Sequence, residues 1–191
     1  MSKSVYIDID GVLYDLCGAI KVVLASRGIT FYPENVSSWN FDGDIGCKKA
    51  DVYSTFKDKS IYAGKHLYDG VVDSLQRLRN AGYRTVGYSS CVDNIDIFEL
   101  RKKLFNVLGL EGEPHMSDGS GSKPYIDDED CVAIFDDCIG IHEMWLSNNF
   151  KGYQYLISQP YTKEYNNPSL IKVASFNDAV DDFLTKEVLL V

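Results

Sequence analysis

Two aspartates, Asp8 and Asp10, stand one residue apart at the end of an apolar run, in the stretch VYIDIDGVLYD. Side chains two positions apart on an extended chain share one face, so both carboxylates can converge on one point. Gly11 allows the backbone to turn sharply there and to approach a ligand closely. Taken alone, the pair is more often a solvated strand end. It does not fit an EF-hand loop, because Leu13 and Ala19 stand where that loop needs Gly and Glu.

Three further groups of polar residues follow predicted strands or lie in loops. Ser89 and Ser90 follow the run YRTVGY, and their hydroxyls and backbone N–H groups suit phosphate oxygens. Asp136 and Asp137 follow the apolar run CVAIF, which favours a divalent cation with oxygen ligands. Lys123 lies in the loop GSGSKP, which is not a Walker A loop. Each of these residues, taken alone, has an ordinary structural explanation: Ser89 and Ser90 could start a turn, and Lys123 could lie on the surface.

The elements that must position these residues alternate along the chain. Strands are expected at residues 5–9, 83–88, 131–135, 153–157 and 171–174, with a short one near 114–116. Helices are expected around residues 16–24, 52–56, 71–78, 95–108 and 139–148, and a last one after a capping box of Ser175 and Asp178. This order predicts an α/β fold with a parallel sheet and helices on both faces.

Residues 15–66 separate the first strand from the alternating part of the chain. Their segment is aromatic and rich in loops, with helical spacing only at its two ends. We therefore expect a small, mainly helical cap at residues 15–66, inserted after the first strand of a core domain of residues 1–14 and 67–191.

Charge and composition exclude several classes of function. The formal net charge is −9, and no basic stripe is present, so extended nucleic acid and anionic membranes are not expected as partners. An anionic substrate then needs a metal ion that reverses the local charge. No apolar run approaches the ~20 residues of a membrane helix, and no signal peptide precedes the first strand, so a cytoplasmic protein is expected. The five cysteines form no CxxC pair and are expected to be reduced thiols.

In chain order, the motifs DIDGV, YSS, SK and FDD resemble the four motifs of the haloacid dehalogenase superfamily. The resemblance covers about two-thirds of the chain. Within the superfamily, DIDGVLYD together with QPYTKEYNNPSLIKVASFNDAVDDFL resembles the 5'(3')-deoxyribonucleotidase family. Two features depart from that family: Cys138 replaces an Arg after the paired acids, and residues 15–66 align only loosely.

The resemblance implies a Rossmann-like core and a reaction by covalent catalysis. Asp8 would attack phosphorus to form an aspartyl-phosphate, and Asp10 would act as general acid and then general base. Mg²⁺ would be held by Asp8, by the backbone carbonyl of Asp10 and by one of Asp136 and Asp137; the resemblance favours Asp137 as the direct ligand, with Asp136 orienting it.

The remaining site residues are assigned to the phosphate and to the leaving group. Ser89, Ser90 and Lys123 would hold the phosphoryl oxygens. The resemblance favours a nucleoside 5'-monophosphate as substrate, with Trp39 and Phe41 of the cap stacking on the base. The two aromatic residues fit the cap's own core equally well.

Several alternatives remain open from the sequence. Another small phosphate ester, or a 3'-phosphate end of a nucleic acid, would use the same chemistry, and a catalytically inactive binding module would keep the fold. The expected partner is a small nucleotide rather than a membrane or extended nucleic acid, and a homodimer is compatible with the sequence.

Overall fold

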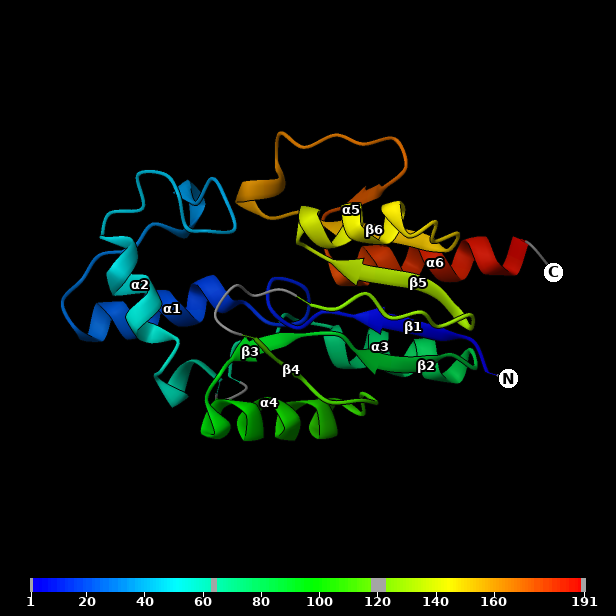
Figure 1. The fold of residues 1–191 in the computed structure, drawn as a ribbon, viewed down its shortest axis with the longest axis horizontal. Coiled ribbons are helices and arrows are strands. Elements are labelled where there is room, and N and C mark those ends of the chain that lie inside the picture. Colours follow the sequence, from blue (N-terminus) through cyan, green and yellow to red (C-terminus); the bar gives the residue numbers. More distant parts are fainter. Residues whose placement is uncertain (1, 63–64, 118–122, 190–191) are drawn as a thin grey trace.

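The computed structural model describes residues 2–62, 65–117 and 123–189. Its centre is a sheet of five parallel strands in the order β2-β1-β5-β6-β7. The strands are β1 (Ser4–Ile7), β2 (Arg84–Gly87), β5 (Cys131–Asp136), β6 (Tyr153–Ile157) and β7 (Ile171–Val173). All five begin and end within two residues of the expected positions, and the predicted α/β fold with a parallel sheet is confirmed (Figure 1).

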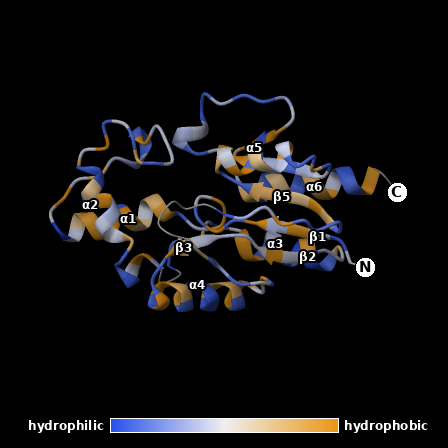
Figure 2. Ribbon diagram, in the orientation of Figure 1, coloured by the Kyte–Doolittle hydropathy of each residue, from blue (hydrophilic) through white to orange (hydrophobic). Residues whose placement is uncertain are grey.

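Helices cover both faces of the sheet because neighbouring residues of each strand point to opposite sides. Val5 and Ile7 face the cluster that contains the inner residues of α3 (Val71–Asn80) and α6 (Phe176–Leu189). Tyr6 faces the other way and packs with Trp145 of α5 (Ile139–Ser147). In Figure 2, β1 and β5 are mainly hydrophobic, as expected for strands buried on both faces.

A second, two-stranded parallel sheet lies beside the first. It consists of β3 (Ser90–Val92) and β4 (His115–Ser117), and α4 (Ile95–Leu108) packs against β3. The short strand expected near residues 114–116 is therefore present, shifted by one residue. β3 was not predicted, because three residues are too few for a hydrophobic period to be visible.

The segment of residues 15–66 contributes no strand to the central sheet in its described part. It contains α1 (Leu16–Ser26), η1 (Pro33–Asn35), α2 (Lys49–Thr55) and η2 (Lys59–Tyr62). In Figure 1 it lies beyond the ends toward which the strand arrows point. Asp15 caps α1 by accepting a hydrogen bond from the Gly18 amide at 2.8 Å. One buried cluster runs from this segment into the body of the protein, so the division into cap and core remains a prediction.

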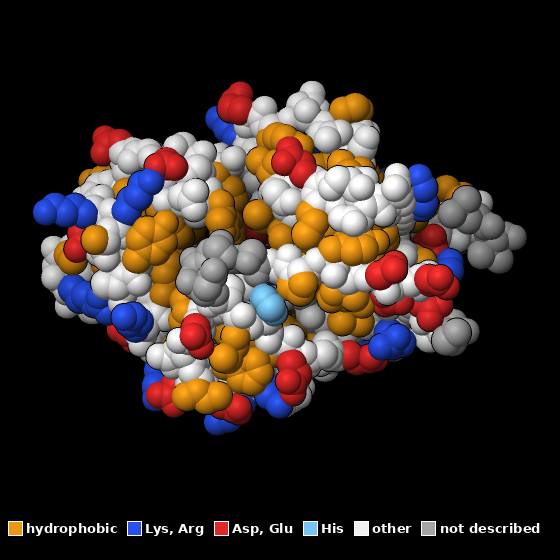
Figure 3. Space-filling model, in the orientation of Figure 1, with side chains coloured by type: hydrophobic (Ala, Val, Ile, Leu, Met, Phe, Trp, Pro, Cys, Tyr) orange, Lys and Arg blue, Asp and Glu red, His pale blue; other side chains and the backbone are white. Residues whose placement is uncertain are grey.

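Other expectations concern cysteines, charge and membranes. The five cysteines are free thiols, as expected. On the face shown in Figure 3, lysine and arginine side chains are interspersed with aspartate and glutamate. Across the described ranges, no helix combines the length and apolar character needed to cross a membrane. The cytoplasmic location and the homodimer remain predictions.

Candidate active site

Three strands deliver the predicted site residues to one edge of the sheet. Ile7 pairs with Gly87 on one side and with Phe135 on the other, so β1, β2 and β5 end in register. The Asp8 amide continues the ladder by donating to the Phe135 carbonyl at 2.9 Å. Beyond this point the chain turns away and the side chains that follow face a common space. This is the site that the general rule for parallel α/β sheets predicts.

The acids at the ends of β1 and β5 form one buried cluster. Oxygen atoms of Asp8, Asp136 and Asp137 all lie within 4.8 Å of one another. Asp136 engages both of its oxygens: Oδ1 accepts from the Cys138 amide at 2.8 Å, and Oδ2 accepts from Lys123. By contrast, Oδ1 of Asp137 is buried and has no hydrogen-bond partner among the described residues. Asp137 therefore offers an oxygen to a ligand, whereas both oxygens of Asp136 are already engaged.

Lys123 lies at the centre of this cluster. Its Nζ donates to Asp136 Oδ2 at 2.6 Å and lies 3.0 Å from Asp8 Oδ1. Burial alone would lower the pKa of Lys123, but the carboxylates of Asp136 and Asp8 raise it above its usual range. The side chain is thus a fixed cation. The loop before it, which contains the predicted GSGS stretch, lies outside the described residues.

Burial also changes the acids themselves. It raises the pKa of Asp8 to about 7; Lys123 opposes this rise, and Asp136 and Asp10 add to it. The pKa of Asp137 is raised well above its usual range by burial and by the charges of Asp8 and Asp136. In both cases burial is the largest cause, and the neighbouring carboxylates add to the rise.

Asp10 is held by a residue that the sequence did not indicate, Arg101 of α4. The buried guanidinium donates through Nη2 to Asp10 Oδ2. The ion pairs of Lys123 are with Asp8 and Asp136 and do not include Asp10. The reason is topological, because Asp10 lies just before the turn at Gly11 and its side chain faces Arg101 of α4 rather than β5. No motif signal marks Arg101, since it lies in an ordinary charged helix.

A second unpredicted group comes from the turn η3 (Pro160–Thr162). The Tyr161 hydroxyl donates to Asp137 Oδ2, and Gln159 Nε2 donates to the Gly11 carbonyl at 2.6 Å. Gly11 has φ +76°, and a Cβ atom on it would lie 1.8 Å from Asp137 Oδ2. A side chain at position 11 would therefore displace the carboxylate. The stretch QPYT was part of the family resemblance, but no single residue of it could be assigned a role.

A cavity of about 330 Å³ adjoins Asp8, Asp10 and Lys123. Its walls include Asp8, Asp10, Ser89, Ser90, Lys123 and Arg101, together with the aromatic residues Trp39, Phe41, Tyr53, Phe56 and Tyr62. All the predicted phosphate-binding residues and both predicted stacking residues thus face one space. Its volume lies within the range of small-molecule sites.

The two aromatic residues differ in their surroundings. Trp39 is 36% exposed and meets the Tyr161 ring edge to face at 5.8 Å. Phe41 is 9% exposed and packs with the rings of Phe31, Tyr53 and Phe56. Phe41 therefore belongs mainly to the core of the cap segment, while Trp39 presents a ring surface to the cavity.

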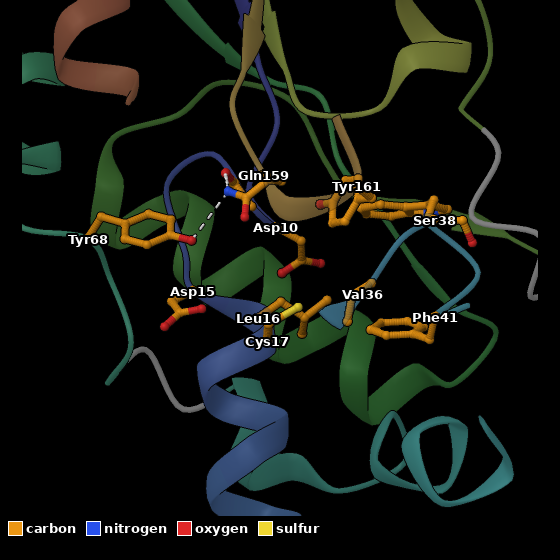
Figure 4. Close-up of a pocket in the computed structure, with 12 residues that line it drawn as sticks. Asp10, Asp15, Leu16, Cys17, Val36, Ser38, Phe41, Tyr68, Gln159 and Tyr161 are labelled. Carbon is orange, nitrogen blue, oxygen red and sulfur yellow. Dashed lines mark hydrogen bonds between the residues drawn. The ribbon is translucent and has the colours of Figure 1, made fainter. Parts of the chain in front are cut away.

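A smaller cavity of about 20 Å³ adjoins Asp10 (Figure 4). Figure 4 shows Asp10 and Tyr161 pointing toward its centre, with Val36 and Phe41 of the cap segment opposite. Such a volume is close to that of one water molecule. Asp10 and Tyr161 of the turn η3 thus border the same small cavity as Val36 and Phe41 of the cap segment.

No protein-family model matches the sequence, and no curated protein matches it. Solved structures do match its fold. CbbY from Rhodobacter sphaeroides, in complex with phosphate, has 14% identity over 93% of this chain and 96% of its own, with a TM-score of 0.51. A phosphoserine phosphohydrolase-like protein from Francisella tularensis subsp. tularensis SCHU S4 has 16% identity over 95% and 99%, with a TM-score of 0.56. A β-phosphoglucomutase from Clostridium difficile has 13% identity over 100% of both chains, with a TM-score of 0.50.

These similarities show that the chain shares the fold of these three solved structures. Membership of the haloacid dehalogenase superfamily remains the prediction made from the sequence motifs. At such low identity, the likeness concerns the fold alone and does not extend to the substrate.

Proposed function

We propose that this protein is a Mg²⁺-dependent phosphatase that hydrolyses (deoxy)nucleoside 5'-monophosphates through an aspartyl-phosphate. The observation that carries the proposal is the position of Asp8. Its carboxylate lies in the acid cluster, beside the fixed cation Lys123, on the wall of a cavity large enough for a nucleotide. A buried carboxylate held in this way is suited to attack a phosphorus atom in line.

The proposed reaction divides between two aspartates. Asp8 attacks phosphorus, and the bond to the leaving oxygen breaks as Asp10 gives that oxygen a proton. Asp10 then takes a proton from the water that hydrolyses the aspartyl-phosphate. Lys123 and the hydroxyls of Ser89 and Ser90 hold the phosphoryl oxygens and stabilise their charge.

The donor set of the cluster fits Mg²⁺. Four carboxylates (Asp8, Asp10, Asp136 and Asp137) face two cations (Lys123 and Arg101), so two negative charges lack compensation when all four acids are ionised. Asp8, Asp137 and the Asp10 carbonyl would hold the ion, with Asp136 orienting the site. When bound, Mg²⁺ would neutralise the repulsion between the carboxylate nucleophile and the phosphate.

The nucleotide part of the proposal rests on the cavity's aromatic wall and on the family resemblance. The exposed ring of Trp39 lines the same cavity as Asp8, so a base could stack there while the phosphate occupies the acid cluster. If the substrate were instead another small phosphate ester, its hydrolysis would need the acid cluster but not Trp39.

The experiment is a phosphate-release assay over a substrate panel, with Mg²⁺ and with EDTA. The panel contains nucleoside 5'-monophosphates, sugar phosphates, p-nitrophenyl phosphate and an oligonucleotide with a 3'-phosphate. Nucleotides are expected to give the highest kcat/KM, and EDTA to abolish release. Preference for sugar phosphates would overturn the nucleotidase proposal and leave the phosphatase chemistry intact, while no release from any substrate would favour a binding module.

A further inference from the structure

Arg101 is more deeply buried than its ion pair with Asp10 alone would require. Its side chain is 1% exposed. The guanidinium carbon lies 4.7 Å from the centre of the Tyr62 ring and 5.9 Å from that of Tyr14. Two aromatic rings and Asp10 thus fix the guanidinium in one orientation.

The pairing with Asp10 leaves donors of this guanidinium unused. Nη2 donates to Asp10, whereas Nε and Nη1 are buried and have no hydrogen-bond partner in the described part of the chain. Arg101 nevertheless lines the large cavity together with Asp8 and Asp10. Buried N–H groups without partners are rare, because they lose their hydrogen bonds to water. The unused donors therefore suit an acceptor that arrives with the substrate.

The charge balance indicates which kind of acceptor this is. The positive charge of Arg101 is already compensated by Asp10, and the carboxylate of Asp8 lies near enough to interact with it electrostatically. A second anionic group on the substrate would be repelled by these carboxylates. A neutral oxygen, such as that of a hydroxyl group, accepts a hydrogen bond without adding negative charge.

The position of Asp10 indicates which part of the substrate is reached. In the proposed reaction, Asp10 lies within hydrogen-bond distance of the leaving oxygen, and Arg101 is bonded to Asp10. The unused donors therefore lie next to the atoms that follow the leaving oxygen. In a nucleoside these atoms belong to the sugar, while the base extends toward the aromatic wall.

We propose that Arg101 donates a hydrogen bond to a sugar hydroxyl of the substrate and so selects a hydroxylated leaving group. This inference rests on the proposed nucleotidase function and extends it to the sugar. It makes Arg101 a specificity residue in addition to its contact with Asp10.

The test compares two substrates that differ only in the sugar: a deoxynucleoside 5'-monophosphate and the 2',3'-dideoxynucleotide with the same base. The wild-type protein is expected to prefer the hydroxylated substrate at least tenfold in kcat/KM. In Arg101→Met the ratio is expected to fall toward one. The same variant also loses the contact with Asp10, which slows the hydrolysis of both substrates alike because both leaving groups are alkoxides. This effect therefore cancels in the ratio of the two kcat/KM values.

Two further variants make the result unambiguous. Arg101→Lys keeps a positive charge for Asp10 but lacks the planar fork, so the ratio is expected to fall here too, and this variant decides the question if Arg101→Met does not fold. Lys102→Met changes an exposed residue of the same helix and is expected to keep the wild-type ratio. A wild-type ratio near one, or an unchanged ratio in the Arg101 variants, overturns this inference alone. Absence of all nucleotide hydrolysis in the wild type overturns the proposed function, and the inference with it.

Discussion

The ammonium group of Lys123 lies between the carboxylates of Asp136 and Asp8, at 2.6 Å and 3.0 Å from their nearest oxygens. This contact joins the residues at the ends of β1 and β5 to a lysine from a separate loop. The three groups are buried together, so none of their charges is screened by water as a surface pair would be. Removing one partner therefore affects both the stability of the site and the charge that a substrate encounters.

Asp8→Asn is expected to abolish turnover while the protein remains folded. The change removes the proposed nucleophile and also one negative charge from a cluster with too few cations, so the melting temperature should not fall. Phosphate release and thermal unfolding measure the two effects. Asp73→Asn, on the exposed side of α3, is the matched control and should keep full activity. Wild-type turnover in Asp8→Asn would exclude Asp8 as the nucleophile.

Mg²⁺ is expected to raise the melting temperature of the protein, and EDTA to reverse the effect. Binding to the folded state alone stabilises it by ~2.7 kcal/mol at a concentration of 100 Kd. Asp137→Asn should remove most of this shift, because Asp137 has a buried oxygen without a hydrogen-bond partner among the described residues and is the proposed ligand. Ca²⁺ should also stabilise the protein but support little turnover, since its larger and looser coordination would misplace Asp8. Full activity in chelator would rule out the metal site.

Without metal, stability is expected to fall as the pH rises from about 4 to about 7. Burial raises the pKa of Asp8 from 3.8 to about 7, so the folded protein binds a proton that the unfolded chain has already lost. This contribution is complete below the unfolded value and disappears as the pH passes the folded value. Urea unfolding at several pH values in EDTA measures it. Asp8→Asn should show a flatter dependence; an equal slope in both proteins would assign the effect to other groups.

Gly11→Ala is expected to destabilise the protein and weaken its response to Mg²⁺. A residue with a side chain is strained at φ +76°, by ~1–3 kcal/mol, and its Cβ atom would also displace Asp137. Gly140→Ala in α5 is the control, because no atom lies within 4 Å of the added Cβ there and alanine favours a helix. Thermal unfolding with and without Mg²⁺ compares the two. Equal behaviour of both variants would mean that position 11 does not shape the site.

The motif residues could be predicted because their positions follow from local rules. An apolar run ending in polar residues marks the end of a parallel strand, and such ends meet at one edge, which placed Asp8, Ser89 and Asp136 together. Arg101 and Tyr161 could not be found in this way. They reach the site from a helix and a turn, and their distance from the acids depends on how these elements pack on the sheet.

In the cap segment too, local sequence rules predict the helices but not the positions of the side chains. Its helices follow from hydrophobic spacing, although α2 begins at Lys49 rather than at residue 52, since the polar first turn lacks an apolar signal. Which of its aromatic side chains face the cavity is a property of the folded segment. Only the structure separates Trp39 from Phe41, although the sequence presents them as equivalent.

Trp39→Ala and Phe41→Ala are therefore expected to act in different ways. Trp39→Ala removes an exposed ring from the cavity wall and should lower kcat/KM for nucleotides by an amount equivalent to ~1–3 kcal/mol of stacking, with little change in melting temperature. Phe41→Ala removes a ring buried among other rings, so it should lower the free energy of unfolding by ~3–5 kcal/mol. Hydrolysis of p-nitrophenyl phosphate, which mainly engages the phosphate site, is the internal control and should hardly change in Trp39→Ala. If Trp39→Ala slows both substrates equally, the ring supports the cap segment or Tyr161 rather than the base, and the leaving group is recognised elsewhere in the cavity.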